Sequence, residues 1–238
     1  MSRTLTRRHM GHDDILEAHP VEVTLNYVLV SAAPILALYL LFRWLWGNSM
    51  LTTVTQLLAP GYNSQGLASV WFIFVWGTVG TLLLTKLFGR DDYSYESRGV
   101  RVLRGWWVSL NAGVFEEFVY RAWLFLIVMP VLQFVNFITF GLVEWVYSWW
   151  LPVVNWATFG ALEPQLLHSG WLLGAAISMA ASMFSDAHKY LGWIGYINSW
   201  FLGMIMFFLV FNYGLLTAIV AHVLYDVVVL TTRTLLSD

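Results

Sequence analysis

Residues 190–225 read YLGWIGYINSWFLGMIMFFLVFNYGLLTAIVAHVLY and contain no Asp, Glu, Lys or Arg. A helix of about 20 residues crosses the ~30 Å hydrocarbon core of a bilayer, so this stretch is too long for a single span. The natural break is Asn212-Tyr213-Gly214, because Asn and Gly favour turns. The stretch therefore predicts one membrane helix near 193–211 and another near 215–233.

Stretches of the same kind fill much of the rest of the chain, at 24–42, 66–85, 122–143, 145–162 and 164–185. Hydrophobic residues make up 59% of the 238 residues and charged residues only 11%, where a soluble domain has about 25% charged residues. No water-soluble fold of this size can bury so much apolar surface. We therefore expect an all-α fold, a polytopic transmembrane helix bundle of about six to eight spans.

The same composition excludes several classes of protein. So many apolar residues and so few charges rule out a disordered chain, a coiled coil and a nucleic-acid binder. The chain has no Cys, which excludes a disulfide framework, a thiolate nucleophile and thiolate-bound zinc. The lipid bilayer is the partner that the composition predicts, and no nucleic acid is expected.

Basic residues predict the orientation of this integral, multi-pass membrane protein. The polar tail 1–24 has three Arg, the connection 47–65 has no Lys or Arg, and the segment 86–104 has five of them. Because cytoplasmic loops carry an excess of Lys and Arg, we expect the N-terminal tail and 86–104 in the cytoplasm and 47–65 on the far side. The next membrane segment then starts near Gly105.

The stretch 130–170 fits two interpretations. Pro130, Pro152 and Pro164 interrupt apolar sequence that is rich in Trp. Such a pattern is typical of interfacial or re-entrant segments as well as of complete spans. We detect no repeat of fixed period and no soluble domain, so the number of spans stays open here.

Ionisable residues inside the predicted spans indicate where the chemistry lies, because a charged side chain at mid-bilayer costs at least ~2.5–3.5 kcal/mol. Glu116 lies roughly 18 Å along the helix from Arg104, near the middle of the membrane. Glu117 and Arg121 are four residues apart, and we expect them to pair on one helix face. Glu116 is turned about 100° from that pair, which leaves its carboxylate to act as a general base. The alternative is a buried ion pair that only fixes helix packing.

Two histidines lie in later apolar segments. His188 follows Phe184 by four residues at the end of one segment, where a lone His is more often a capping or interfacial residue. His222 and Asp226 share one face of the final span, and a carboxylate commonly fixes the tautomer of a neighbouring imidazole. The alternative for this pair is a hydrogen bond between helices, worth ~1 kcal/mol.

Taken in order on successive membrane helices, these motifs read Glu-Glu-x-x-x-Arg, Phe-x-x-x-His and His-x-x-x-Asp. This order resembles the CAAX protease and bacteriocin-processing (CPBP, or Abi) family, which includes the type II CAAX prenyl endopeptidases. The matching residues are Glu116, Glu117, Arg121, Phe184, His188, His222 and Asp226. We accordingly divide the chain into a cytoplasmic tail (1–24), a transmembrane hairpin with a basic loop (25–104) and a CPBP-like catalytic bundle (105–234).

The resemblance implies an intramembrane endopeptidase that hydrolyses a membrane-associated peptide or protein, such as a prenylated CAAX-type protein or a leader peptide. Glu116 would take a proton from water, and His188 and His222 would position that water or polarise the scissile carbonyl. Glu117 and Arg121 would hold the helix rotation that aims the catalytic carboxylate.

Two questions about this site stay open. Glu116, His188 and His222 are also a plausible zinc set, so the cofactor is either none or Zn. Asp226 stands where the family commonly has Asn, which can donate a hydrogen bond to an oxyanion, whereas an ionised Asp only accepts. Asp226 is then protonated, or orients His222, or helps to hold a metal.

Two other functions fit the same residues. Glu116, His222 and Asp226 could form the relay of a proton- or ion-coupled transporter, although transporters often have inverted repeats. The chain could also be a catalytically silent membrane scaffold whose Trp-rich belts bind proteins or lipids. Proteolysis remains the preferred hypothesis because it uses all three motifs together.

Overall fold

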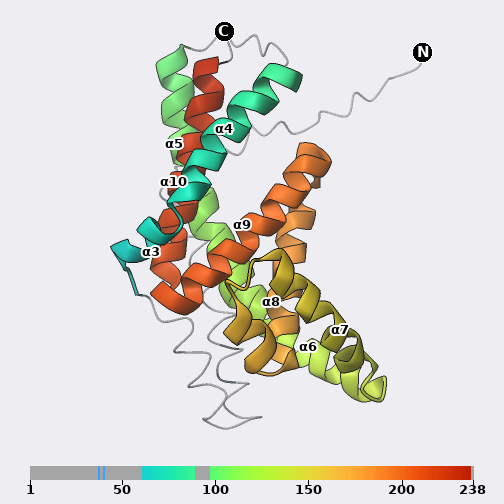
Figure 1. Ribbon diagram of the computed structural model, residues 1–238. Coiled ribbons are helices and arrows are strands. Elements are labelled where there is room, and N and C mark those ends of the chain that lie inside the picture. The colour runs from blue at the N-terminus through green and yellow to red at the C-terminus, as the bar shows by residue number, and fades with distance from the viewer. Residues whose placement is uncertain (1–36, 38–39, 41–60, 89–96, 237–238) are drawn as a thin grey trace, which may run out of the picture.

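The computed structural model describes residues 37, 40, 61–88 and 97–236 (Figure 1). The predicted tail 1–24 lies outside the described residues, as do nearly all of the predicted span 24–42 and most of the connection 47–65.

Every regular element within these ranges is helical, which confirms the all-α prediction for this part of the chain. In chain order the elements are α3 (Ser64–Ser69), α4 (Trp71–Phe88), α5 (Arg98–Glu117), the π-helical segment η2 (Phe118–Leu124), α6 (Phe125–Ile138), α7 (Leu142–Ala157), the π-helical segment η3 (Pro164–His168), α8 (Trp171–Ala187), the short 3-10 helix η4 (Lys189–Leu191), α9 (Gly192–Tyr213) and α10 (Leu215–Leu236).

Three helices of the described chain are long and apolar enough to cross a membrane: Arg98–Ile138, Lys189–Tyr213 and Leu215–Leu236. The first runs without a break through α5, η2 and α6 and contains 41 residues. Shorter apolar helices cover Trp71–Leu83 and Trp171–Ala187. The lengths and compositions indicate a multi-pass membrane protein.

The predicted break between the last two helices is confirmed. α9 ends at Tyr213 and α10 begins at Leu215. Gly214 between them has φ 94°, a left-handed conformation that favours glycine, and a Cβ there would overlap the backbone of Gly61. The sharp turn between the two helices therefore depends on this glycine.

Two details differ from the expectations. The helix that was expected to enter the membrane near Gly105 begins about two turns earlier, at Arg98, so its arginines lie on the helix itself. Pro130 and Pro152 lie inside α6 and α7 rather than at breaks. Apolar helices tolerate proline where local adjustments satisfy the carbonyl that it frees. The breaks in this region come instead at Gly141 and Gly160, both with positive φ.

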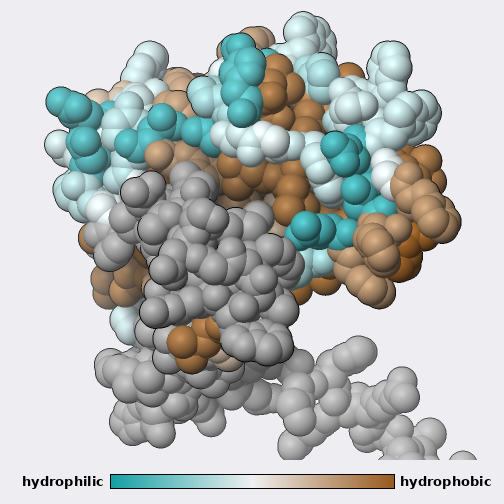
Figure 2. Space-filling view, turned by 90° about the horizontal axis from the view of Figure 1, so that it is seen from below, coloured by the Kyte–Doolittle hydropathy of each residue, from teal (hydrophilic) through white to brown (hydrophobic). Residues whose placement is uncertain are grey.

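The helices form two packed groups (Figure 1). α4, α5 and α10 pack together in one group, and α6, α7 and α8 form the other. α9 belongs to both cores, because its Phe207 packs with α6 and α8 while its Met206 packs with α4 and α10. Seen from below, hydrophobic and hydrophilic side chains alternate over the visible face (Figure 2).

Candidate active site

The site begins with a close approach between α5 and α10. Gly113 of α5 is buried, and a Cβ at this position would come within 2.6 Å of the Val223 side chain and 3.0 Å of its backbone nitrogen. Only a glycine lets the two helices come this close, as is common at interfaces between membrane helices. Glu117 lies one turn after Gly113 and His222 lies next to Val223, so this contact brings the two side chains together.

Glu117 contacts two side chains at the centre of the site. Its Oε2 lies 3.2 Å from Arg121 Nε, which confirms the pair that their spacing predicted. Its Oε1 accepts a hydrogen bond of 2.7 Å from His222 Nδ1. All three side chains are buried. Glu117 is therefore the carboxylate that orients His222, a role that the spacing of four residues had also suggested for Asp226.

Arg121 is buried without exposure to solvent, and aromatic rings surround it. Its guanidinium carbon lies 4.6 Å from the Phe184 ring centroid and 5.4 Å from that of Phe207. One nitrogen donates to the Gly203 carbonyl at 3.5 Å. These contacts link η2 to α8 and α9, and with Glu117 they compensate for the burial of a cation.

His188 lies just after the end of α8, and its ring position is set by Phe184. The backbone carbonyl of Phe184 accepts a 2.8 Å hydrogen bond from His188 Nδ1. The Phe184 ring contacts His188 at 4.6 Å and His222 at 5.8 Å between centroids. A further anchor is Ser185, whose hydroxyl donates to the carbonyl of Tyr196 and so ties α8 to α9.

Glu116 stands between the two imidazoles. Its Oε2 lies 3.8 Å from His188 Nε2 and 3.8 Å from His222 Nε2. This oxygen is buried and has no hydrogen-bond partner. Asp226 Oδ2 is 3.7 Å from His222 Nε2, on the same side of the ring. The candidate residues from α5, α8 and α10 thus face one small volume.

The hydrogen bonds fix which nitrogen of each ring carries a proton. A backbone carbonyl can only accept, so Nδ1 of His188 is the protonated nitrogen, and the carboxylate of Glu117 imposes the same tautomer on His222. In the neutral rings both Nε2 atoms then present lone pairs toward Glu116. Two nitrogens and two carboxylate oxygens converge with no donor among them, which is an arrangement that binds a proton donor such as water.

Zinc fits this arrangement less well. Within the described ranges, no group of three or more His, Asp or Glu side chains is spaced to hold a metal ion. Ligands at about 2.0–2.1 Å around a tetrahedral zinc lie roughly 3.4 Å apart. The distances of 3.8 Å from Glu116 Oε2 to the two histidines are wider than that. The residues as they stand do not form the zinc set named above.

The structure adds residues that the sequence patterns did not single out. Phe184 was noted only as part of a motif, but its ring lies against Tyr120, Arg121 and both histidines. Tyr190 stacks beside His188 with 6.0 Å between centroids and is exposed. Gly113 could have been recognised as a small residue in an apolar helix, whereas nothing in the sequence marked the Gly203 carbonyl.

Comparison with known proteins adds no relative. No family model matches the chain, and neither a curated protein nor a solved structure matches it.

Proposed function

We propose that the protein is an intramembrane endopeptidase in which Glu116 activates a water molecule for attack on a peptide bond. The observation that carries this proposal is the buried, unpartnered Oε2 of Glu116, 3.8 Å from Nε2 of both His188 and His222. A water molecule at this point can donate one hydrogen to Glu116 and the other to an imidazole. Its lone pair is then free to attack.

The reaction needs only the side chains of this site and water. Glu116 takes a proton from the water as the new bond forms between the water oxygen and the carbonyl carbon. The same proton then passes to the amide nitrogen as the C–N bond breaks, which releases an amine and a carboxylic acid. His188 and His222 hold the water, because the Nε2 lone pair of either imidazole accepts its other hydrogen.

The surrounding residues have supporting roles in this proposal. Glu117 and Arg121 neutralise one another and keep His222 in one tautomer, so that its lone pair faces the reacting centre. Asp226 does not contact Nδ1 of His222, and its place beside Nε2 suits a group that binds the substrate or the water. The motif order that resembles the CPBP family agrees with these roles.

The setting of the site suits a substrate held at the membrane. Glu116 and Asp226 are each about a quarter exposed, so the polar centre is open on one side while His222 is closed off. We propose a bundle of about six to eight spans with a cytoplasmic N-terminus, as the distribution of Lys and Arg suggests. The substrate is a membrane-associated peptide or protein, for example a prenylated C-terminus or a leader peptide.

Comparative mass spectrometry of membrane-associated peptides tests the proposal. Membranes that contain wild-type protein should accumulate cleavage products, and membranes with Glu116→Gln should lack them. Glu163→Gln is the matched control, because Glu163 is exposed and, among the described residues, pairs only with the exposed His168. Loss of the products in Glu116→Gln but not in Glu163→Gln supports the general base, provided that both variants insert and purify normally.

The same comparison separates the rival functions. Unchanged peptide products in Glu116→Gln would remove the base assignment. Substrate-dependent proton flux into vesicles without any peptide product would instead favour a transporter.

A further inference from the structure

The polar groups that converge on the water leave one requirement of peptide hydrolysis unmet. As the water oxygen adds to the carbonyl carbon, an electron pair moves to the carbonyl oxygen, which then needs a hydrogen-bond donor. Glu116 and Asp226 only accept hydrogen bonds when they are ionised. In the neutral rings, Nε2 of His188 and of His222 is an acceptor as well, because Nδ1 carries the proton. A donor has to come from a further side chain.

The two nearest cations are already engaged. Arg121 is buried, pairs with Glu117 at 3.2 Å, and has its guanidinium 4.6 Å from the Phe184 ring centroid. Lys189 lies next to His188 in the chain, but its Nζ is 2.8 Å from Asp186 Oδ1. Both cations therefore stabilise the protein around the site.

Tyr190 brings a hydroxyl to the open side of the site. Its ring stacks beside that of His188, with 6.0 Å between the centroids and 29° between the planes. The charges of Glu116 and Asp226 both act on its hydroxyl, so this group lies in the field of the two acids that flank His222 Nε2. The side chain is 78% exposed and makes no hydrogen bond to another described residue. Its O–H is thus available to a substrate.

The backbone that carries Tyr190 is fixed on both sides. Before it, Lys189 forms the ion pair with Asp186 that joins η4 to the last turn of α8. After it, the Leu191 N–H donates to the His188 carbonyl at 3.0 Å and closes the single turn of η4. An exposed side chain on a fixed backbone can turn toward a substrate without displacing His188.

We propose that Tyr190 is the oxyanion donor of the endopeptidase. Its O–H donates a hydrogen bond to the carbonyl oxygen of the scissile bond as negative charge develops there. Tyr190 keeps its proton throughout. When the C–N bond breaks, the electron pair on the oxygen re-forms the carbonyl, and Glu116 delivers its proton to the leaving nitrogen. This role rests on the proposed function, and it adds a catalytic residue that lies outside the three motifs.

Tyr190→Phe isolates the hydroxyl, because it keeps the ring beside His188. The measurement is kcat and KM of the purified full chain in detergent, with a peptide that spans a cleavage site found in the membrane comparison. Loss of one oxyanion donor typically lowers kcat about 10²–10³-fold. KM should stay near the wild-type value, because the hydrogen bond strengthens only in the transition state.

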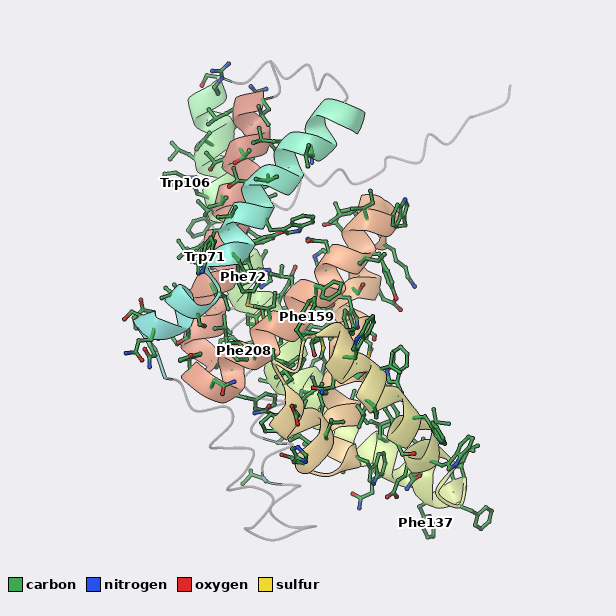
Figure 3. The ribbon with its side chains drawn as sticks, viewed as in Figure 1. Trp71, Phe72, Trp106, Phe137, Phe159 and Phe208 are labelled. Atoms are coloured by element: carbon green, nitrogen blue, oxygen red, sulfur yellow. The ribbon has the colours of Figure 1, made fainter. Side chains whose placement is uncertain are left out.

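Tyr62→Phe is the matched control, because it removes an exposed hydroxyl at the other end of α9. Gly61, beside it in the chain, lies against Gly214 in the turn between α9 and α10. Figure 3 shows Phe208 near this end of α9. Tyr190 precedes the opposite end of the helix, so Tyr62→Phe should keep the wild-type kcat.

Tyr120→Phe tests the competing hydroxyl. The Tyr120 ring lies edge-on to Phe184, with 5.2 Å between centroids, and the charge of Glu116 acts on its hydroxyl as well. Its ring does not stack on a histidine of the site, so Tyr120→Phe should lower kcat much less than Tyr190→Phe. A larger loss in Tyr120→Phe would assign the donor to Tyr120 and overturn the proposal.

The double variant Tyr190→Phe/Asp226→Asn distinguishes a donor from a structural residue. An Asn amide can donate a hydrogen bond, whereas an ionised Asp cannot. The double variant should therefore regain part of the kcat that Tyr190→Phe loses. No recovery would mean that the Tyr190 hydroxyl does not act on the oxyanion.

The remaining outcomes separate this proposal from the proposed function. Cleavage by Tyr190→Phe with the wild-type kcat refutes the oxyanion donor alone and leaves Glu116 as the base. A raised KM with an unchanged kcat would make Tyr190 a residue that only binds substrate, which also overturns the proposal. Absence of cleavage by the wild-type protein refutes the endopeptidase, and the role of Tyr190 with it.

Discussion

At the scale of single residues, Glu117 and Asp226 have different roles, because Glu117 is the carboxylate that orients His222. Glu117 accepts the Nδ1 hydrogen bond at 2.7 Å, whereas Asp226 faces Nε2 at 3.7 Å. Glu117 is also the only described carboxylate within ion-pair distance of the buried Arg121. The stability of the centre therefore depends on Glu117. Asp226 is not needed to orient His222.

Glu117→Gln should destabilise the protein strongly. The substitution leaves the Arg121 guanidinium buried with no anion, and breaking a buried pair in this way costs about 3–5 kcal/mol. Glu163→Gln, which removes an exposed ion pair, should cost less than about 1 kcal/mol. Thermal unfolding of the two purified variants in the same detergent measures the difference. Equal unfolding temperatures would contradict the role given to Glu117.

Asp226→Asn should retain cleavage. The tautomer of His222 is set by Glu117, so the change leaves both Nε2 lone pairs in place, and an Asn amide can donate to an oxyanion. The rate of peptide cleavage, compared with wild type and with Glu116→Gln, is the measurement. A loss of activity as complete as that of Glu116→Gln would assign Asp226 an essential role as an acid or base.

At the scale of helices, the contact at Gly113 and Val223 determines whether the site forms. The distance from a Cβ at Gly113 to the backbone nitrogen of Val223 would be 3.0 Å, and a backbone atom cannot rotate away. The sequence spacing predicted the pair within one helix, Glu117 and Arg121. It did not predict the bond between Glu117 and His222, which are 105 residues apart, because that contact depends on how closely two helices pack.

Gly113→Ala should therefore push α5 away from α10. Overpacking of this kind typically costs about 1–3 kcal/mol, and the Glu117–His222 hydrogen bond should weaken with it. Gly99→Ala is the matched control in the same helix, because a Cβ at Gly99 meets nothing within 4 Å. Unfolding temperature and peptide cleavage should both fall for Gly113→Ala and stay level or rise for Gly99→Ala. The reverse order would refute the close contact.

Phe140, between α6 and α7, has φ 54° and permits a different test at this scale. Phe140→Gly removes the left-handed strain of about 1–2 kcal/mol, although glycine gives back roughly 0.5–1 kcal/mol through the entropy of the unfolded chain. The unfolding temperature in detergent should therefore be unchanged or higher. A marked fall in detergent would show that the Phe140 side chain packs within the protein rather than against lipid.

At the scale of the whole molecule, the apolar stretches predicted the fold class better than they predicted where the helices end and how they pack. The break at Asn212-Tyr213-Gly214 could be predicted because its turn residues interrupt a long apolar run. The course of 130–170 could not, since Pro130 and Pro152 read as breaks but lie inside helices. For the site, the motif spacings identified the ionisable residues, but their convergence depends on packing between α5, α8 and α10, which no local pattern encodes.

The central claim is that three side chains act together on one water molecule: Glu116 of α5, His188 just after α8, and His222 of α10. The most direct measurement is single-turnover cleavage, by purified protein in heavy-oxygen water, of a peptide found in the membrane comparison. Wild-type protein should place one heavy oxygen in the new C-terminal carboxylate, and Glu116→Gln should form no product. Cleavage by Glu116→Gln at the wild-type rate, or a product that carries no heavy oxygen, would contradict the account.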